Sequence, residues 1–152
     1  MAFLATGVVL SDDEDLLRYE PNLDEHWPRK DRNGNVKRDW SVQHKLAAEE
    51  IQRRFRLRRA TAEPFQLGRV SERTRLELRP VATFLALHFI FVAADSQGDA
   101  SGFFAKKADL YLAKASLLFD GVATTVDYDT DNDGKTDRDE EQQPYPMRVI
   151  RG

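Results

Sequence analysis

The most specific chemical pattern in this sequence is an acidic segment of twelve residues, 129–140. Oxygen-bearing side chains occupy its first, third, fifth, ninth and twelfth places and glycine the sixth, which is the ligand spacing of an EF-hand calcium loop. Gly134 would make the sharp turn, and Lys135 would offer its backbone carbonyl. The pattern therefore predicts calcium as a bound ion, with ligands from Asp129, Asp131, Asp133, Lys135, Asp137 and Glu140.

The sequence around this segment differs from that of an EF-hand, which has a helix on each side of its loop. Residues 122–128 alternate and are rich in β-branched side chains, a strand pattern, and Pro144 follows the segment closely. We expect an isolated acidic loop within a short β-hairpin, with residues 147–150 as the second strand. A solvated turn without metal is the alternative, because turns also favour Asp, Asn and Gly.

A second candidate is a run of arginines near the end of a predicted helix, followed by further arginines up to Arg79. Such a run could contact phosphates, so nucleic-acid binding is one interpretation. Neither a zinc-finger spacing nor an RNA-binding aromatic motif accompanies it. We favour contact with acidic surfaces, within the chain or on neighbouring subunits, and expect charge reversal at Arg54 plus Arg58 to weaken assembly more than the fold. The interface candidates are Arg53, Arg54, Arg56, Arg58 and Arg59.

The sequence offers little that predicts catalysis. It contains no cysteine, and His26, His44 and His88 have no metal or triad partner at a recognisable spacing. No nucleophile elbow, phosphate loop or dinucleotide fingerprint is present. We interpret His44 and His88 as packing residues and expect a protein that is not an enzyme.

Length and composition indicate one soluble domain. The chain has 152 residues, of which 41% are hydrophobic and 32% charged, and its formal charge is -3. The longest apolar stretch, residues 81–94, is shorter than the roughly 20 residues that span a bilayer. We expect no membrane segment and no secretory signal.

The small net charge hides a strong segregation. Residues 1–26 carry seven acids and one base, residues 27–80 carry fifteen bases and seven acids, and residues 127–141 carry eight acids and two bases. Complementary blocks on one chain suit association between subunits.

Hydrophobic periodicity predicts the elements that position these groups. A short helix would be capped at Ser11 and ended by Pro21, and a helix from Ser41 would bury a stripe at three- and four-residue spacings. A third would run over residues 71–94 and a fourth over residues 103–119, stopped by Asp120 and Gly121. The third would contain Pro80 and carry on one side Leu76, Pro80, Phe84, Leu87 and Phe91. The expected stripe of the second helix is Trp40, His44, Ala47, Ala48, Ile51 and Phe55, and that of the fourth is Phe104, Ala108, Tyr111, Leu112, Ala115 and Phe119.

We therefore expect a mainly α protein. Its three-helix core would occupy residues 41–121, after an irregular N-terminal arm over residues 1–40 with a short helix and a loop. The short C-terminal β-hairpin with its acidic, calcium-type loop would occupy residues 122–152.

The order of these features resembles the head-to-tail connector (adaptor) proteins of tailed bacteriophages. The resemblance lies in the acidic N-terminal helix, the basic helix, the apolar helix from Leu78 through Pro80 to His88, and the helix with Lys106, Lys107 and Tyr111. An Asp-rich loop and a short terminal strand follow. It covers most of the chain from residue 41 onward and rests on helix order and composition.

The resemblance implies a homo-oligomeric ring of about 12 copies that docks under the portal and joins the DNA-filled capsid to the tail. Its partners would be the portal protein and tail or neck proteins, with non-specific DNA contact in the lumen. The location would be the neck of the virion, after assembly in the host cytoplasm. The alternatives are a calcium-dependent binding module and a nucleic-acid-binding protein with a basic helix.

Overall fold

The computed structural model describes residues 7–26, 33–35, 39–58, 64–96 and 101–129. Over these residues the chain is mainly helical, as predicted. The α-helices are α1 (Asp13–Tyr19), α2 (Leu23–His26), α3 (Ser41–Arg58), α4 (Glu72–Asp95) and α5 (Phe103–Ala123), and a 3-10 turn, η1, covers Leu67–Arg69.

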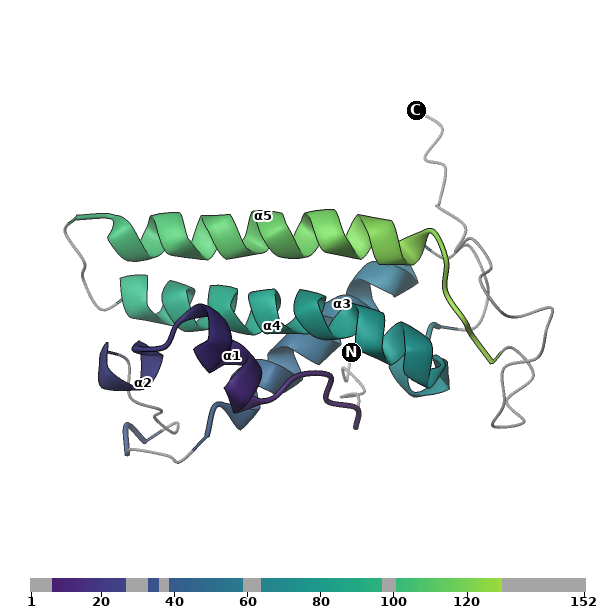
Figure 1. The fold of residues 1–152 in the computed structure, drawn as a ribbon, viewed down its shortest axis with the longest axis horizontal. Coiled ribbons are helices and arrows are strands. Elements are labelled where there is room, and N and C mark those ends of the chain that lie inside the picture. Colours follow the sequence, from purple (N-terminus) through teal and green to yellow (C-terminus); the bar gives the residue numbers. More distant parts are fainter. Residues whose placement is uncertain (1–6, 27–32, 36–38, 59–63, 97–100, 130–152) are drawn as a thin grey trace.

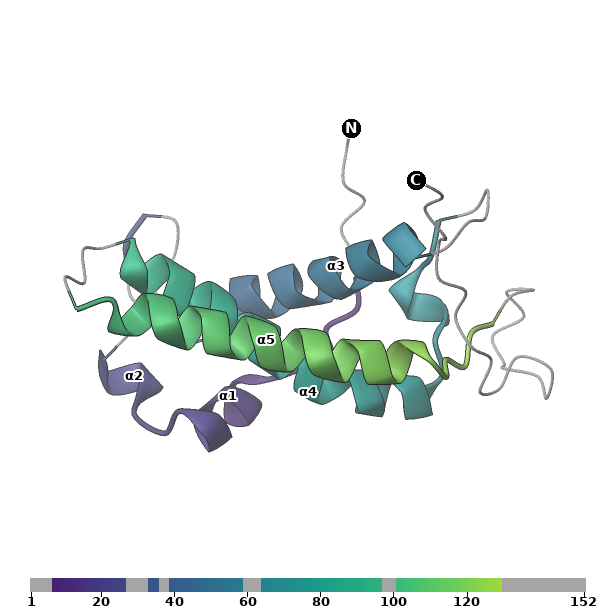
Figure 2. The same ribbon diagram turned by 90° about the horizontal axis from the view of Figure 1, so that it is seen from above.

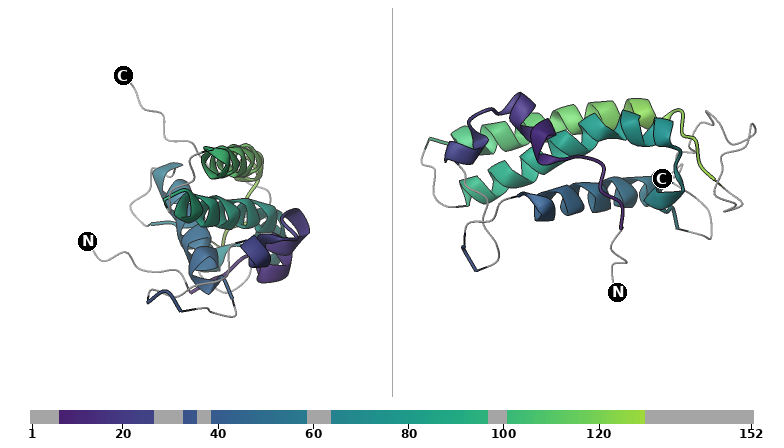
Figure 3. Two further views of the ribbon diagram at one scale, coloured as in Figure 1. Left: turned by 90° about the vertical axis from the view of Figure 1, so that its left-hand side faces the viewer. Right: turned by 60° about the horizontal axis from the view of Figure 1, so that its bottom comes forward.

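The central element is α4, which lies alongside α5 and is crossed by α3 (Figure 1). Viewed from above, α3 lies on one side of α4 while α1 and α2 lie on the other (Figure 2). The view along the long axis agrees, with α5 forming a third side (Figure 3). α4 therefore has neighbours on several sides and contacts α5, α3 and α1.

The predicted stripe of α3 is confirmed. All six of its residues, from Trp40 to Phe55, are buried, because apolar side chains at three- and four-residue spacings share one face of a helix. Phe55 stacks on Phe65 and meets Phe119 of α5 edge-on, with ring centroids 4.4 and 4.8 Å apart. This aromatic contact joins α3 to α5 near their C-terminal ends.

The apolar helix is also confirmed, with bounds close to those expected. Ser71 caps α4 by accepting the backbone N–H of Thr74, and the helix continues through Pro80. Every residue from Val81 to Leu87 is buried. Leu76 is 61% exposed, so its expected place in the core is wrong: the buried face of the first turns carries Thr74 and Leu78 instead.

Among the described residues, α4 alone is long and apolar enough to cross a membrane. Its most apolar stretch is 56% buried by the surrounding helices. That burial is typical of the central helix of a bundle, which needs apolar side chains on several faces.

The fourth predicted helix is longer than expected. α5 begins after Gly102, whose positive φ of 70° suits glycine, and buries Ala108, Tyr111, Ala115 and Phe119. Asp120 and Gly121 do not stop it, because burial of Ala123 one turn after Phe119 favours a further helical turn.

The N-terminal segment packs into the same core. Leu10, Leu16 and Leu23 are buried with the helices of the core. α1 is capped by Asp12 rather than Ser11: Asp12 accepts the N–H of Asp15, and Asp15 accepts the N–H of Asp12. This reciprocal capping box satisfies two donors at the helix start, and the expected Ser11 cap is wrong.

The strand expected over residues 122–128 is wrong, and no strand is formed in the described part of the chain. Val122 and Ala123 belong to α5, and Tyr128 makes one isolated antiparallel bridge with Val70. The described residues that follow α5 are fixed against the start of α4 and the residues just before it. The expected second strand, residues 147–150, lies outside the described residues.

Candidate assembly surfaces

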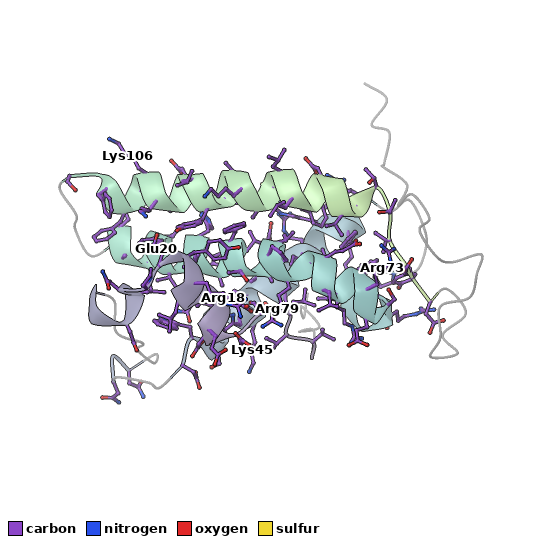
Figure 4. The ribbon with its side chains drawn as sticks, viewed as in Figure 1. Arg18, Glu20, Lys45, Arg73, Arg79 and Lys106 are labelled. Carbon is purple, nitrogen blue, oxygen red and sulfur yellow. The ribbon has the colours of Figure 1, made fainter. Side chains whose placement is uncertain are left out.

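Acidic and basic residues from distant parts of the sequence meet within the chain. Arg79 of α4 donates from Nε to Asp15 Oδ2 at 2.8 Å and from Nη2 to Asp12 Oδ2 at 3.1 Å. Figure 4 shows Arg79 between α4 and α1, beside Arg18. On the other end of α1, Glu20 accepts from Lys107 Nζ at 2.6 Å and from the Tyr111 hydroxyl. These contacts fix the N-terminal segment to α4 and α5.

Asp15 titrates below its ordinary range. Burial alone would raise its pKa, but the hydrogen bonds from Arg79 and from the Asp12 backbone, with the charge of Arg79, lower the pKa overall. A carboxyl whose pKa is lower in the folded state stabilises the protein above its unfolded pKa, near 3.8, and loses this contribution as the pH falls through the folded value.

We therefore expect Asp15→Asn to be less stable than the parent near pH 7, and the difference to shrink steadily below about pH 4. Urea unfolding at a series of pH values measures it. Asp109→Asn is the matched control, because Asp109 is exposed on α5. A stability difference that stays constant into acid would contradict the assigned role of the Asp15 carboxylate.

Asp127, which is 4% exposed, hydrogen-bonds the chain after α5 to the start of α4. Its Oδ2 accepts from Arg73 Nε at 2.7 Å and from Ser71 Oγ at 2.8 Å, and its Oδ1 accepts from Arg73 Nη2 at 2.8 Å. Its backbone N–H donates to Thr74 Oγ1, and its carbonyl accepts the N–H of Ser71. Asp127 thus connects the chain after α5 to the first turn of α4, where Arg73 is labelled in Figure 4.

Arg69 holds the next residues. Its Nε donates to the Asp129 carbonyl at 2.8 Å, its own carbonyl accepts the Asp129 N–H at 2.9 Å, and its guanidinium lies 5.2 Å from the centre of the Tyr128 ring. Asp129, the first residue of the calcium pattern, is 5% exposed. The acidic segment therefore begins from an anchored residue.

The other predicted calcium ligands, Asp131, Asp133, Lys135, Asp137 and Glu140, lie outside the described residues. No group of three or more acidic or histidine side chains suited to a metal occurs within the described ranges. Calcium binding by the segment stays a prediction.

If the segment binds calcium, calorimetry on EDTA-treated protein at millimolar calcium should give a saturable signal, since this ligand pattern binds calcium at or below about 1 mM. Asp131→Ala together with Asp133→Ala should abolish the signal, whereas Asp24→Ala, outside the segment, should keep it. Parent protein without a signal would identify the segment as a turn.

The described arginines of α3 contact other residues of the same chain. Arg54 donates to Glu50 at 3.0 Å and to Ser116 Oγ of α5 at 3.1 Å, and Arg58 binds Asp120 of α5. Both guanidinium groups lie over the Phe119 ring, 5.7 and 4.9 Å from its centre. Arg56 donates to the Phe65 carbonyl, while Arg53 forms a bidentate pair with Glu50. Arg59 lies outside the described residues.

This placement changes the result we expect at Arg54 and Arg58. Reversing both charges should lower the free energy of unfolding by about 1–2 kcal/mol, because contacts to Ser116 and Asp120 are lost and like charges meet. Urea unfolding measures the loss, with Lys106→Glu, a charge reversal at an exposed residue of α5, as the control. A variant with parental stability but no assembly would instead support a role in the interface alone.

The later arginines are also engaged within the chain. Arg69, Arg73 and Arg79 make the contacts above, and Arg75 Nη2 donates to the Gly68 carbonyl at 2.9 Å. Each of these guanidinium groups therefore has at least one acceptor within the folded chain.

The structure brings together one cluster that the sequence spacing did not reveal. Ser11 Oγ lies 2.7 Å from His44 Nδ1, and Asp13 Oδ1 lies 2.9 Å from His44 Nε2. Asp13 can accept a proton from Nε2, while Nδ1 accepts the Ser11 hydroxyl in a neutral ring and donates to Ser11 Oγ in a protonated ring. The signal in the sequence was only a polar residue, His44, in an otherwise apolar stripe.

These are the residue types of a serine hydrolase triad, but with the two imidazole nitrogens exchanged. A pocket of about 410 Å³ beside them has four carboxylates in its lining, Asp12, Asp13, Glu14 and Asp39, against one lysine, Lys45. Four carboxylates would oppose the negative charge that develops during acyl transfer. Asp13 also accepts the Trp40 N–H at 3.2 Å, so the cluster is better explained as a fastening of the N-terminal segment to α3.

His88 donates from Nδ1 to the Ala108 carbonyl of α5 at 2.8 Å. This bond across the α4–α5 contact agrees with the interpretation of His88 as a packing residue. The side chain of His26 is outside the described set.

A regularly spaced set of exposed apolar side chains lies on the outer side of α5. Phe103, Leu110 and Leu117 recur every seven residues and are 51%, 47% and 76% exposed. A seven-residue repeat keeps side chains on one face of a helix, so they form one stripe, which we call the α5 stripe. Lys106 points away from the bundle beside it (Figure 4).

Comparisons with protein-family models, with curated proteins and with solved structures find no match to this chain.

Proposed function

We propose that this protein is a structural subunit of a head-to-tail connector ring in a tailed bacteriophage. About 12 copies would form the ring, dock under the portal and join the DNA-filled capsid to the tail. The location is then the neck of the virion, and the partners are the portal protein and tail or neck proteins. The assignment to this class of protein is based on the order of helices and charge blocks in the sequence.

The single observation that carries the proposal is the α5 stripe. Its three large side chains are 47–76% exposed, whereas Ala108, Tyr111, Ala115 and Phe119 on the opposite face of α5 are buried. Exposed apolar side chains are expected of a subunit whose surface is completed on assembly. The polar clusters of the chain also support a structural role, since Asp127, His44 and Arg79 join segments of the fold.

A mass measurement tests the proposal. The purified chain, alone and with portal or tail components, should form a defined multimer, and the same chain should be present in purified particles at the same copy number. A protein that stays monomeric and never co-purifies with such components would refute the connector role. Tight retention on DNA with a steep salt dependence, and no multimer, would favour the nucleic-acid alternative.

A further inference from the structure

The chain between α2 and α3 contains a turn in which two consecutive residues, Asn33 and Gly34, are exposed. Gly34 has a φ of 81°, in the left-handed region that glycine adopts without strain and that Asn-Gly turns often use. Residues 33–35 lie outside the helix bundle (Figures 1 and 3). Neither the polar contacts described above nor the α5 stripe includes this turn.

The backbone nitrogen of Gly34 is open to reaction. Within the described part of the chain, no hydrogen bond holds the Gly34 N–H. A Cβ added to Gly34 would meet no described atom within 4 Å, so the space around this residue is open. Because glycine has no side chain to shield its nitrogen and few backbone restrictions, this nitrogen can approach the side-chain amide of the preceding residue.

We propose that Asn33 is a site of spontaneous deamidation through a cyclic imide. The Gly34 nitrogen forms a bond to Cγ of Asn33, and the bond from Cγ to the side-chain nitrogen breaks. That nitrogen leaves as ammonia, with the proton of the Gly34 N–H. Water then opens the imide at either of its two carbonyl carbons and leaves aspartate or isoaspartate at this position. The sum consumes one water and releases one ammonia, and nothing is oxidised or reduced.

The other asparagines of the described chain lack one of these features. Asn22 is exposed, but the nitrogen that follows it belongs to buried Leu23 and donates to the Glu20 carbonyl at 3.1 Å. Asn35 is also exposed, but Val36 follows it, and a β-branched side chain crowds the backbone nitrogen. The reaction should therefore be selective for Asn33.

Asp120 and Gly121 supply a comparison within the same chain, because aspartate before glycine forms the same imide with loss of water. Gly121 lies inside α5, where the helical hydrogen bonds hold its N–H and fix its backbone. This pair should stay unmodified in the folded chain and react only when the chain unfolds.

The modification changes the charge of the chain before α3. Deamidation adds one negative charge to residues 27–80, in which fifteen bases exceed seven acids. Isoaspartate also directs the backbone through the side-chain carbon and so lengthens the turn. The protein thus acquires a more acidic form as it ages, without an enzyme.

Peptide mass spectrometry of the whole folded chain, incubated in mildly alkaline buffer, tests the proposal. Cleavage after lysine releases the peptide 31–37, which contains Asn33 and Asn35. It should gain the mass of one amide-to-acid conversion, at Asn33 alone, and contain isoaspartate. Gly34→Ala adds a Cβ where space is open, so the helical circular dichroism should stay parental. Its deamidation should be slower at least about ten-fold, or about 1.4 kcal/mol in the barrier.

The urea-unfolded chain supplies a second measurement. Asn33 should react at nearly the same rate in the folded and unfolded chains, whereas Asp120 should form isoaspartate only in urea. Asn33 that reacts much more slowly in the folded chain, or in neither state, would overturn the inference. Aspartate without isoaspartate would also overturn it, because direct hydrolysis would then replace the imide. None of these outcomes depends on ring formation, so the proposed function is tested separately.

Discussion

Asp127→Ala is expected to lower the free energy of unfolding by about 2–3 kcal/mol, the largest stability loss that we predict for a single polar side chain in this protein. The buried carboxylate accepts three hydrogen bonds from Ser71 and Arg73. Its removal leaves the Arg73 guanidinium without its bidentate partner, although Glu77 still accepts from Nη1 at 2.7 Å. Because Arg73 is partly exposed, water recovers some of the loss, and the estimate stays below that for a fully buried pair.

Thermal unfolding should show the same change as a decrease in Tm of roughly 5–10 °C. Asp127→Asn keeps the shape of the side chain and one acceptor oxygen, so its decrease in Tm should be smaller. Asp109→Ala removes an exposed acid from α5 and should have almost no effect. If Asp127→Ala and Asp109→Ala unfolded at the same temperature, Asp127 would not hold the chain after α5 to α4.

The second large effect concerns assembly. Leu110→Asp combined with Leu117→Asp should reduce incorporation into particles at least about ten-fold, because each leucine loses a burial worth roughly 1.5–3 kcal/mol and a charge enters the contact. The fold should be retained, since both side chains are already in solvent. Particle yield and circular dichroism of the purified chain measure the two effects.

Leu76→Asp is the matched control for this variant. Leu76 is an equally apolar residue, 61% exposed, but it lies on the first turns of α4 and outside the α5 stripe. It should be incorporated like the parent. Normal incorporation of the α5 variant would remove the observation on which the proposed function depends.

The sequence predicted the helices because helical periodicity is a local property. The stripe from Trp40 to Phe55 and the apolar run from Val81 to Leu87 are buried where the pattern placed them. The errors were the burial of Leu76, the strand over residues 122–128 and two helix ends. Residues near Asp12 and Ala123 have several acceptable local conformations, and contacts with distant residues select among them.

The candidate site was predicted less well. The charge blocks were visible in the sequence, but their partners were not, since Arg79 pairs with Asp15 and Arg73 with Asp127 across more than fifty residues. Segregated charge alone fits pairing within one chain or between two chains equally well. In the structure, both of these pairs form within one chain.

The sequence by itself therefore determined a helical, cysteine-free chain with separated acidic and basic blocks and an acidic segment spaced for calcium. Only the tertiary structure decided which charges are used within the fold, that His44 joins Ser11 to Asp13, and that the α5 stripe stays in solvent. The physical reason is that periodicity records which side of a helix is apolar, whereas exposure and ion pairing depend on the packing of helices far apart in the sequence.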